Sequence, residues 1–266
     1  MANIQINFFS QAINRLTTVQ MILPNDAVAE MTINNPHYKR PMKTLFLLHG
    51  YSGNSWDWAY GSLVAELALK YNLAVVMPSG DNSFYVNAKA SGYRYEDFIV
   101  KDLLAYIQKT FSLAMETKDT FIGGLSMGGF GAIRLGLAHP ECFGKIVGLS
   151  SALIIEDIKD MTEDSPAAKV ANKAYYEQTF GELSKLDESC VNPEYLIKQS
   201  LKNKEEIRPV FMACGSEDFL IENNRNFHKF LEREGVAHIY KESPGVHDWK
   251  FWNEYLEPAI QWLLDA

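Results

Sequence analysis

Cysteine is scarce in this chain, and its three copies follow no metal-binding or disulfide pattern. Cys142, Cys190 and Cys214 lie far apart, without a CxxC pair or the Cys/His spacing that is typical of zinc sites. An odd number of thiols without evident pairing is typical of a reducing compartment. The sequence therefore predicts neither a disulfide framework nor a metal site.

Basic charge is also in short supply. Lysine and arginine number 25 against 33 aspartate and glutamate residues, so the net charge is −8 and the isoelectric point is about 5.3. Nucleic-acid phosphates and anionic membrane surfaces both attract a basic face. We therefore expect neither nucleic acid nor a membrane as a partner.

Long hydrophobic runs and a secretory signal are missing as well. No apolar run approaches the roughly 18 residues that a membrane span requires. The first ten residues contain no basic segment, long apolar stretch or small-residue cleavage site, so we expect a cytoplasmic protein. Hydrophobic residues still make up 47% of the 266 positions, which is enough for a sizeable core. This length suits a single domain over residues 1–266.

Short apolar runs alternate with longer stretches of helical spacing after residue 41. Runs that are apolar on both faces are typical of central parallel strands, because helices cover both sides of such a sheet. Two earlier segments, Ala2–Ser10 and Arg15–Leu23, alternate apolar and polar residues as half-buried strands do. The pattern predicts an α/β fold with a mostly parallel central sheet and ligands at the carboxyl ends of its strands. The five predicted central strands are 44–48, 73–77, 120–122, 146–149 and 209–213.

The stretch 152–207 is too long for a simple connection between two strands. It is charged, mostly helix-like, and falls before the penultimate predicted strand. Inserts of this size in compact domains are often functional. We predict a helical cap or insertion within the domain, and the alternative is a helical decoration away from the functional site.

The strongest motif is Gly-Leu-Ser-Met-Gly at 124–128, between the strand at 120–122 and a predicted helix at 131–138. In that setting, G-x-S-x-G forms a nucleophile elbow. Its glycines let strand and helix pass closely, and the helix N-terminus favours developing negative charge. The alternative is a glycine-rich turn that only packs a helix against the sheet. We interpret Ser126 as a catalytic nucleophile.

A serine nucleophile needs a histidine base, and that base needs an orienting carboxylate. With this type of elbow, the acid and then the histidine follow the serine along the chain. His247 lies in a loop before the predicted closing helix at 249–264, and Asp218 lies in the turn after the strand at 209–213. We predict these two residues as base and acid, with Glu217 as the competing acid. The other downstream histidines lie in or beside predicted regular elements: His139, His228 and His238.

Two backbone N–H groups are needed to stabilise the oxyanion of an acyl-transfer intermediate. One belongs to the residue after the nucleophile, Met127. The other belongs to the loop after the third strand, where we predict Tyr51, with Ser52 as the alternative. His49 in the same loop precedes the serine, so we expect it to hold the loop by hydrogen bonds.

Aromatic residues flank the catalytic segments and are candidates for contact with the substrate. We name Trp56, Phe219 and Trp249, and the alternative is that these side chains belong to the core.

Several segments together resemble the esterase D-like group of the α/β-hydrolases, and most closely its small bacterial tributyrin-type carboxylesterases. The group also includes S-formylglutathione hydrolases and feruloyl or acetyl esterases. The resemblance implies the α/β-hydrolase fold, hydrolysis of short-chain acyl esters without metal or organic cofactor, and a triad of Ser126, Asp218 and His247. One departure is Tyr-Ser-Gly at 51–53, where S-formylglutathione hydrolases typically have Leu-Thr-Cys. The segments that carry the resemblance are 48–53, 77–79, 121–132, 214–218 and 244–249.

We therefore expect a serine carboxylesterase that acts on a small-molecule ester through an acyl-enzyme, and a homo-oligomer is compatible with this expectation. An S-formylglutathione hydrolase-like thioesterase, a feruloyl or acetyl esterase and an acyltransferase use the same triad and stay open as alternatives. A non-catalytic binding module is disfavoured, because all three triad positions are filled.

Overall fold

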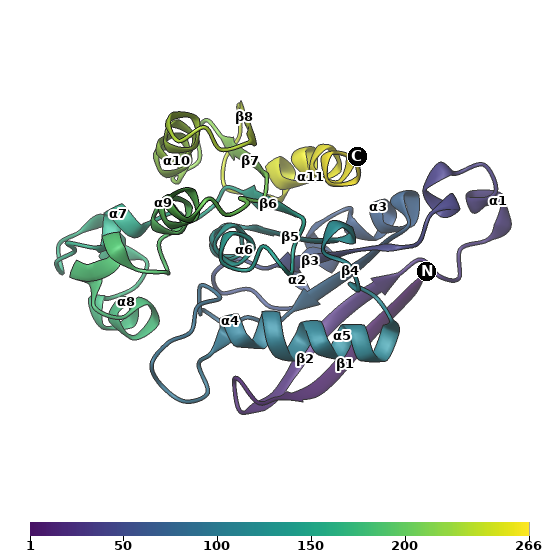
Figure 1. Cartoon of the computed structure of the whole chain (residues 1–266), viewed down its shortest axis with the longest axis horizontal. Coiled ribbons are helices and arrows are strands. Elements are labelled where there is room, and N and C mark those ends of the chain that lie inside the picture. Colours follow the sequence, from purple (N-terminus) through teal and green to yellow (C-terminus); the bar gives the residue numbers. More distant parts are fainter. Residues whose placement is uncertain (266) are drawn as a thin grey trace.

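The computed structural model describes residues 1–265, which form one eight-stranded sheet with helices on both faces (Figure 1). The strand order is β1-β2-β4-β3-β5-β6-β7-β8. Strand β2 runs antiparallel to both of its neighbours, and every pairing from β4 to β8 is parallel. The strands are β1 Ala2–Ser10, β2 Arg15–Leu23, β3 Lys43–Leu48, β4 Leu73–Pro78, β5 Thr120–Leu125, β6 Lys145–Leu149, β7 Val210–Gly215 and β8 His238–Ser243.

The helices lie mostly between consecutive parallel strands, as the alternating pattern predicts. The α-helices are α1 Ala29–Thr32, α2 Asp57–Gly61, α3 Val64–Tyr71, α4 Tyr95–Asp97, α5 Leu104–Phe111, α6 Met127–Ala138, α7 Ile155–Ile158, α8 Lys173–Phe180, α9 Pro193–Asn203, α10 Ile221–Arg233 and α11 Trp249–Leu264. Shorter 3₁₀ or π turns are η1 Pro36–Lys39, η2 Phe98–Leu103, η3 Thr117–Asp119, η4 Pro166–Lys169 and η5 Leu183–Glu188. In the described chain, no helix combines the length and the apolar character needed to cross a bilayer.

The central strands are buried on both faces, which is why they read as continuous apolar runs. Every residue of β4 and β5 is buried, whereas β1 at the sheet edge alternates with solvent. Strand β5 extends three residues beyond the predicted 120–122. Gly123 and Gly124 pair with Val147 and Gly148 of β6, so the ladder continues through glycines that carry no apolar signal.

Two apolar cores cover the two faces of the sheet. One contains the inner faces of α5, α6 and α10, and the other contains α3 and α11. Both cores exclude water from the sheet, so burial of apolar surface is the main stabilising contribution. The sheet is thereby a rigid base for the loops at its carboxyl edge.

The insertion 152–207 contains α7, η4, α8, η5 and α9, drawn in green in Figure 1. It packs against residues outside the insertion. Phe180 of α8 lies 4.9 Å from Phe84 and 5.8 Å from Phe130 between ring centroids, so it contacts both the loop after β4 and helix α6. The insertion therefore has a fixed place beside the elbow.

Candidate active site

Ser126 lies in the turn between β5 and α6, with φ 53° and ψ −121°. A positive φ is costly for a residue with a side chain and persists where the surroundings enforce it. The Ser126 N–H donates to the Leu149 carbonyl at 2.9 Å, which fixes the turn to β6. The resulting geometry is the sharp strand-to-helix turn that the motif predicts.

The two glycines of the motif are required by close backbone contacts. A Cβ atom on Gly124 would lie 2.2 Å from the Gly128 carbonyl oxygen. A Cβ atom on Gly128 would lie 2.2 Å from the carbonyl oxygen of Leu48, at the end of β3. Backbone atoms cannot move aside as a flexible side chain can, so only glycine is accommodated at either position.

Asp218 and His247 form a hydrogen-bonded pair at the carboxyl edge of the sheet. His247 Nδ1 lies 2.9 Å from Asp218 Oδ2, and the other oxygen of Asp218 accepts the Leu220 N–H at 2.9 Å. Burial by itself raises the pKa of the Asp218 carboxyl, but the bonds from His247 and Leu220 outweigh it and hold that pKa below its ordinary value. The carboxylate therefore stays charged and directs the proton of the imidazole to Nδ1, which leaves Nε2 as an acceptor.

No hydrogen bond between Ser126 and His247 is formed in the described chain. Catalytic hydrogen bonds of this kind are often long before substrate binds and tighten in the complex.

Glu217, the competing acid, and Asp248, which follows His247 in the sequence, both have other partners. Glu217 Oε2 accepts the Gly245 N–H at 2.8 Å, which ties together the loops after β7 and β8. Asp248 caps α11, where its Oδ1 accepts the Phe251 N–H at 2.9 Å. Neither carboxylate is hydrogen-bonded to His247.

The other downstream histidines also have partners away from the elbow. His139 Nε2 lies 2.8 Å from Glu96, and His228 Nδ1 lies 2.8 Å from His238 Nε2. Their places in or beside helices and strands agree with the sequence prediction.

His49 holds the loop after β3, as predicted. Its Nε2 accepts the Gly80 N–H at 2.8 Å, and its Nδ1 lies 2.7 Å from the Gly50 carbonyl. The side chain is buried, and burial lowers the pKa of His49, so the ring is neutral near pH 7. This imidazole joins the loops after β3 and β4.

The two candidate oxyanion donors lie beside Ser126. Met127 is the first residue of α6, where a backbone N–H has no partner within the helix. In the described chain the Tyr51 N–H donates no hydrogen bond, whereas the Ser52 N–H donates to Asn82 Oδ1 at 2.7 Å. The engagement of Ser52 favours Tyr51 over the alternative donor.

A cavity of about 480 Å³ opens at Ser126. Phe219 lies at its wall with 70% of its surface exposed, and its ring centroid is 4.6 Å from that of His247. Residues of the insertion form much of the wall. They are Ala152, Ile154, Asp157, Ser165, Pro166, Ala167, Val170 and Tyr176.

Of the three aromatic candidates for substrate contact, Phe219 reaches this cavity and the two tryptophans do not line it. Trp56 stacks on Tyr60 at 5.0 Å, and Trp249 packs edge-on against Trp58 at 5.4 Å. Proximity in sequence to a catalytic segment does not fix the direction of a side chain. Sequence reasoning missed Phe84 and Tyr176, which line the cavity and carry no motif.

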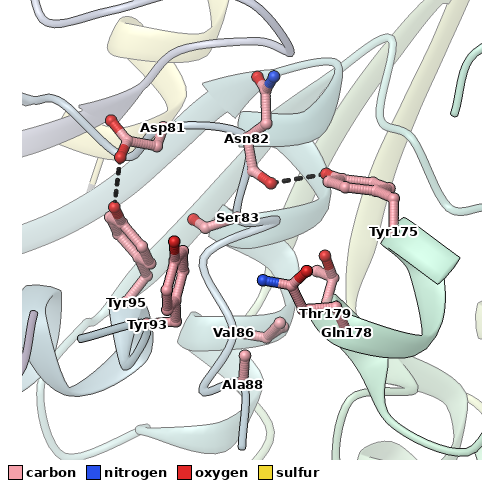
Figure 2. A pocket seen from close by; sticks show the side chains of 10 residues that line it. All are labelled: Asp81, Asn82, Ser83, Val86, Ala88, Tyr93, Tyr95, Tyr175, Gln178 and Thr179. Carbon is pink, nitrogen blue, oxygen red and sulfur yellow. Dashed lines mark hydrogen bonds between the residues drawn. The ribbon is translucent and has the colours of Figure 1, made fainter. Parts of the chain in front are cut away.

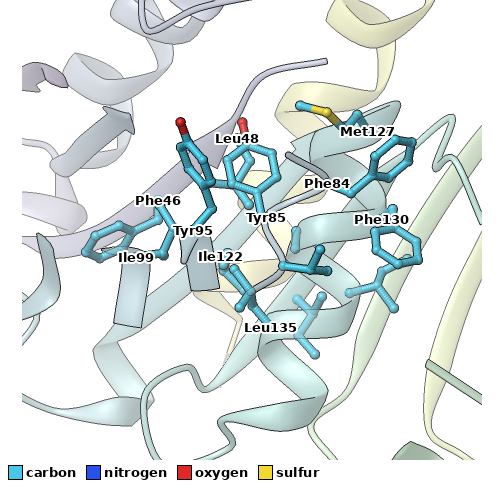
Figure 3. Packing of buried hydrophobic residues seen from close by; sticks show 14 of the residues in the cluster. Phe46, Leu48, Phe84, Tyr85, Tyr95, Ile99, Ile122, Met127, Phe130 and Leu135 are labelled. Atoms are coloured by element: carbon cyan, nitrogen blue, oxygen red, sulfur yellow. The ribbon is translucent and has the colours of Figure 1, made fainter. Parts of the chain in front are cut away.

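Buried apolar side chains pack at the start of α6, next to the turn that holds Ser126. Figure 3 shows Phe84, Tyr85, Met127 and Phe130 gathered at the start of α6. Phe84 and Phe130 meet edge to face at 5.5 Å, a favourable aromatic geometry. This packing fixes the helix end that carries the Met127 N–H.

Comparison with known proteins decides the family. The sequence model of the Esterase family matches residues 10–263. The chain belongs to this esterase family. It is 40% identical to an acetyl esterase of Caldicellulosiruptor saccharolyticus over 99% of this chain and 98% of that protein.

Solved structures agree with this assignment. The esterase superposes on a fluorophosphonate-binding serine hydrolase of Staphylococcus aureus, FphF, with a TM-score of 0.84, 30% identity and coverage of 100% and 99% of the two chains. It also superposes on an S-formylglutathione hydrolase of Staphylococcus aureus, with a TM-score of 0.82, 30% identity and 99% coverage of both chains. The chain is thus a carboxylic ester hydrolase with the α/β-hydrolase fold.

The cavity of the esterase carries negative charge. Asp157 and Glu222 contribute carboxylates to its wall, and none of the lining residues is lysine or arginine. Glu222 is paired with Arg225 at 2.5 Å, but Asp157 accepts a hydrogen bond only from the neutral amide of Asn223, at 2.6 Å. The charge of Asp157 is therefore not compensated by an ion pair within the described chain.

Proposed function

We propose that this esterase hydrolyses short-chain acyl esters of neutral alcohols, with Ser126 as nucleophile, His247 as base and Asp218 as the orienting acid. The observation that carries the proposal is the 2.9 Å bond between His247 and the buried Asp218, formed at the same sheet edge as the strained Ser126. The acetyl esterase relative and the fluorophosphonate-binding neighbour support both the acyl class and the serine chemistry.

In the proposed reaction, His247 Nε2 accepts the hydroxyl proton as Ser126 Oγ attacks the ester carbonyl carbon. The N–H groups of Tyr51 and Met127 stabilise the resulting oxyanion, and such a donor typically contributes on the order of 3 kcal/mol to lowering the barrier. The imidazolium then protonates the leaving alcohol, which departs as the acyl-enzyme forms. Water repeats these steps and releases the acid and free Ser126.

We further propose that the insertion 152–207 is a cap within a single domain, and that it selects the substrate. Eight of its residues line the cavity at Ser126, which supports a role at the site rather than a decoration elsewhere. The cavity volume of about 480 Å³ falls in the range of small-molecule sites. The three free cysteines support action in the cytoplasm.

Acyl selectivity tests the substrate class. We expect kcat/KM for p-nitrophenyl acetate and butyrate to exceed that for the dodecanoate at least about tenfold, because the cavity at Ser126 is small and partly open to solvent and would leave much of a long chain unburied. A series of p-nitrophenyl esters from two to twelve carbons measures this. A maximum at ten or twelve carbons would contradict the short-chain proposal.

The second candidate is an S-formylglutathione hydrolase, which the Staphylococcus aureus neighbour favours. Glutathione thioesters carry carboxylate groups, and Asp157 would repel them inside the cavity. A site for anionic substrates normally provides lysine or arginine, which this lining lacks. The charge of the cavity therefore favours neutral esters.

Asp157→Asn is expected to raise kcat/KM for the anionic ester mono-p-nitrophenyl succinate about two- to fivefold. Removal of one exposed charge near the substrate relieves on the order of 1 kcal/mol of repulsion or less. The neutral p-nitrophenyl butyrate is expected to change less than twofold, and added salt is expected to reduce the difference. Steady-state kinetics on both esters at low and high ionic strength measure the effect.

Glu156→Gln is the matched control, because Glu156 is the neighbouring carboxylate, pairs with Lys159 and does not line this cavity. Equal gains in the two variants, or no gain in Asp157→Asn, would remove the charge argument for neutral substrates.

A further inference from the structure

Residues 49–53 after β3 form the oxyanion loop, and the loop after β4 holds these residues at three points. Two lie at His49: the Gly80 N–H donates to its Nε2 at 2.8 Å, and the Tyr85 hydroxyl donates to its carbonyl at 3.1 Å. The third lies one residue from the proposed donor, where Asn82 Oδ1 accepts the Ser52 N–H at 2.7 Å. Asn82 thus holds the oxyanion loop at Ser52, and just beyond that loop Ser79 Oγ accepts the Ser55 N–H at 3.1 Å.

Asn82 is itself held by the insertion. The hydroxyl of Tyr175 on α8 donates to the backbone carbonyl oxygen of Asn82 at 2.6 Å, as Figure 2 shows. The ring of Tyr175 also meets the ring of Tyr51 edge-on, with centroids 5.8 Å apart and planes at 89°. Tyr175 therefore contacts Tyr51, the proposed oxyanion donor. It also contacts Asn82, which accepts the N–H of the next residue, Ser52.

The backbone held by these contacts is strained. Ser52 has a φ of 65°, and in the facing loop Asp81 and Phe84 have φ values of 45° and 50°. Left-handed conformations of non-glycine residues cost of order 1–3 kcal/mol each and relax unless neighbours hold them. A second cavity of about 320 Å³, lined by Asn82 and Tyr175, leaves room for such relaxation (Figure 2).

We propose that Asn82 is a positioning residue for the oxyanion hole. Its side-chain oxygen accepts the Ser52 N–H and stabilises the left-handed backbone conformation of Ser52. The N–H of the preceding residue, Tyr51, is then free and directed at the substrate. The hydroxyl of Tyr175 supports Asn82 from the insertion. The inference rests on the proposed function, because it requires Ser126 chemistry with Tyr51 as an oxyanion donor.

Asn82→Leu removes the acceptor but keeps the number and branching of the non-hydrogen side-chain atoms, and it is expected to lower kcat about 10- to 100-fold, because a misplaced oxyanion donor loses transition-state stabilisation. KM for p-nitrophenyl acetate is expected to stay within about threefold, since Asn82 itself does not line the cavity at Ser126. Asn82→Asp keeps an acceptor oxygen in the same place and is expected to restore kcat to within about threefold of wild type. Asn82 is exposed, so solvent screens the added charge.

Tyr175→Phe provides an independent variant, because it removes only the hydroxyl that holds Asn82 and keeps the ring against Tyr51. We expect a smaller loss of kcat, about threefold, again with KM little changed. Should Asn82→Leu unfold, the pair Tyr175→Phe and Asn82→Asp still decides the question. Wild-type kcat in Tyr175→Phe would then overturn the proposal.

Ser126→Ala separates this inference from the proposed function. If Ser126→Ala is inactive while Asn82→Leu keeps at least half of the wild-type kcat, the positioning role is wrong and the serine mechanism stands. The role is equally wrong if Asn82→Leu raises KM and leaves kcat unchanged, or if Asn82→Asp is as impaired as Asn82→Leu. If Ser126→Ala keeps wild-type activity, both proposals fall together.

Discussion

Ser126→Ala is expected to lower kcat for p-nitrophenyl acetate at least about 10⁴-fold. In the proposed mechanism the hydroxyl oxygen of Ser126 forms the acyl bond, and alanine would leave only the oxyanion donors and substrate binding to accelerate attack by water. The backbone at this position already has a positive φ, and alanine meets the same strain as serine. We therefore expect the melting temperature to shift by less than about 3 °C.

Two measurements together check this result. Initial rates report turnover, and a fluorescent fluorophosphonate reports the nucleophile by covalent labelling, which Ser126→Ala is expected to abolish. Ser184→Ala is the matched control, because Ser184 is an exposed serine of the insertion that does not line the cavity. Activity above a few per cent in Ser126→Ala, or labelling equal to the control, would show that another residue is the nucleophile.

Much of the fold could be predicted because its central strands are buried on both faces. The runs at 44–48 and 73–77 match β3 and β4 to within one residue, since hydrophobic burial and sequence pattern report the same property. The elbow was predictable for a different reason. Close backbone contacts at Gly124 and Gly128 leave no room for any other residue, so the residue type itself indicates the local geometry.

The wall of the cavity could not be predicted in the same way. Tyr176 lines the same cavity as Ser126 only because the insertion packs beside the turn at Ser126, and no local pattern encodes that packing. The bond from Ser52 to Asn82 joins residues 30 positions apart through one amide oxygen. Trp249 shows the reverse case, because it adjoins His247 and Asp248 in sequence yet packs against Trp58. Such contacts depend on tertiary structure and leave no periodic signal.

The sequence leaves Asp218 and Glu217 as candidate acids, and the structure separates them by their hydrogen-bond partners. Both carboxylates follow β7, so chain order alone leaves them as competitors. The turn after the strand separates them. The buried Asp218 is hydrogen-bonded to His247, and Glu217 binds the backbone N–H of Gly245. Their roles are therefore open to a direct test with two isosteric amides.

Asp218→Asn is expected to lower kcat about 10³- to 10⁴-fold. An asparagine amide that donates to Nδ1 of His247 stabilises the tautomer with its proton on Nε2, and that nitrogen can then no longer accept the proton of Ser126. Glu217→Gln keeps an oxygen acceptor for the Gly245 N–H and is expected to keep kcat within about twofold. Parallel measurements of kcat and of thermal unfolding for the two variants decide the assignment. A large loss in Glu217→Gln with little loss in Asp218→Asn would reverse it, because each variant removes one negative charge from the same loop and only the partner of His247 controls the tautomer.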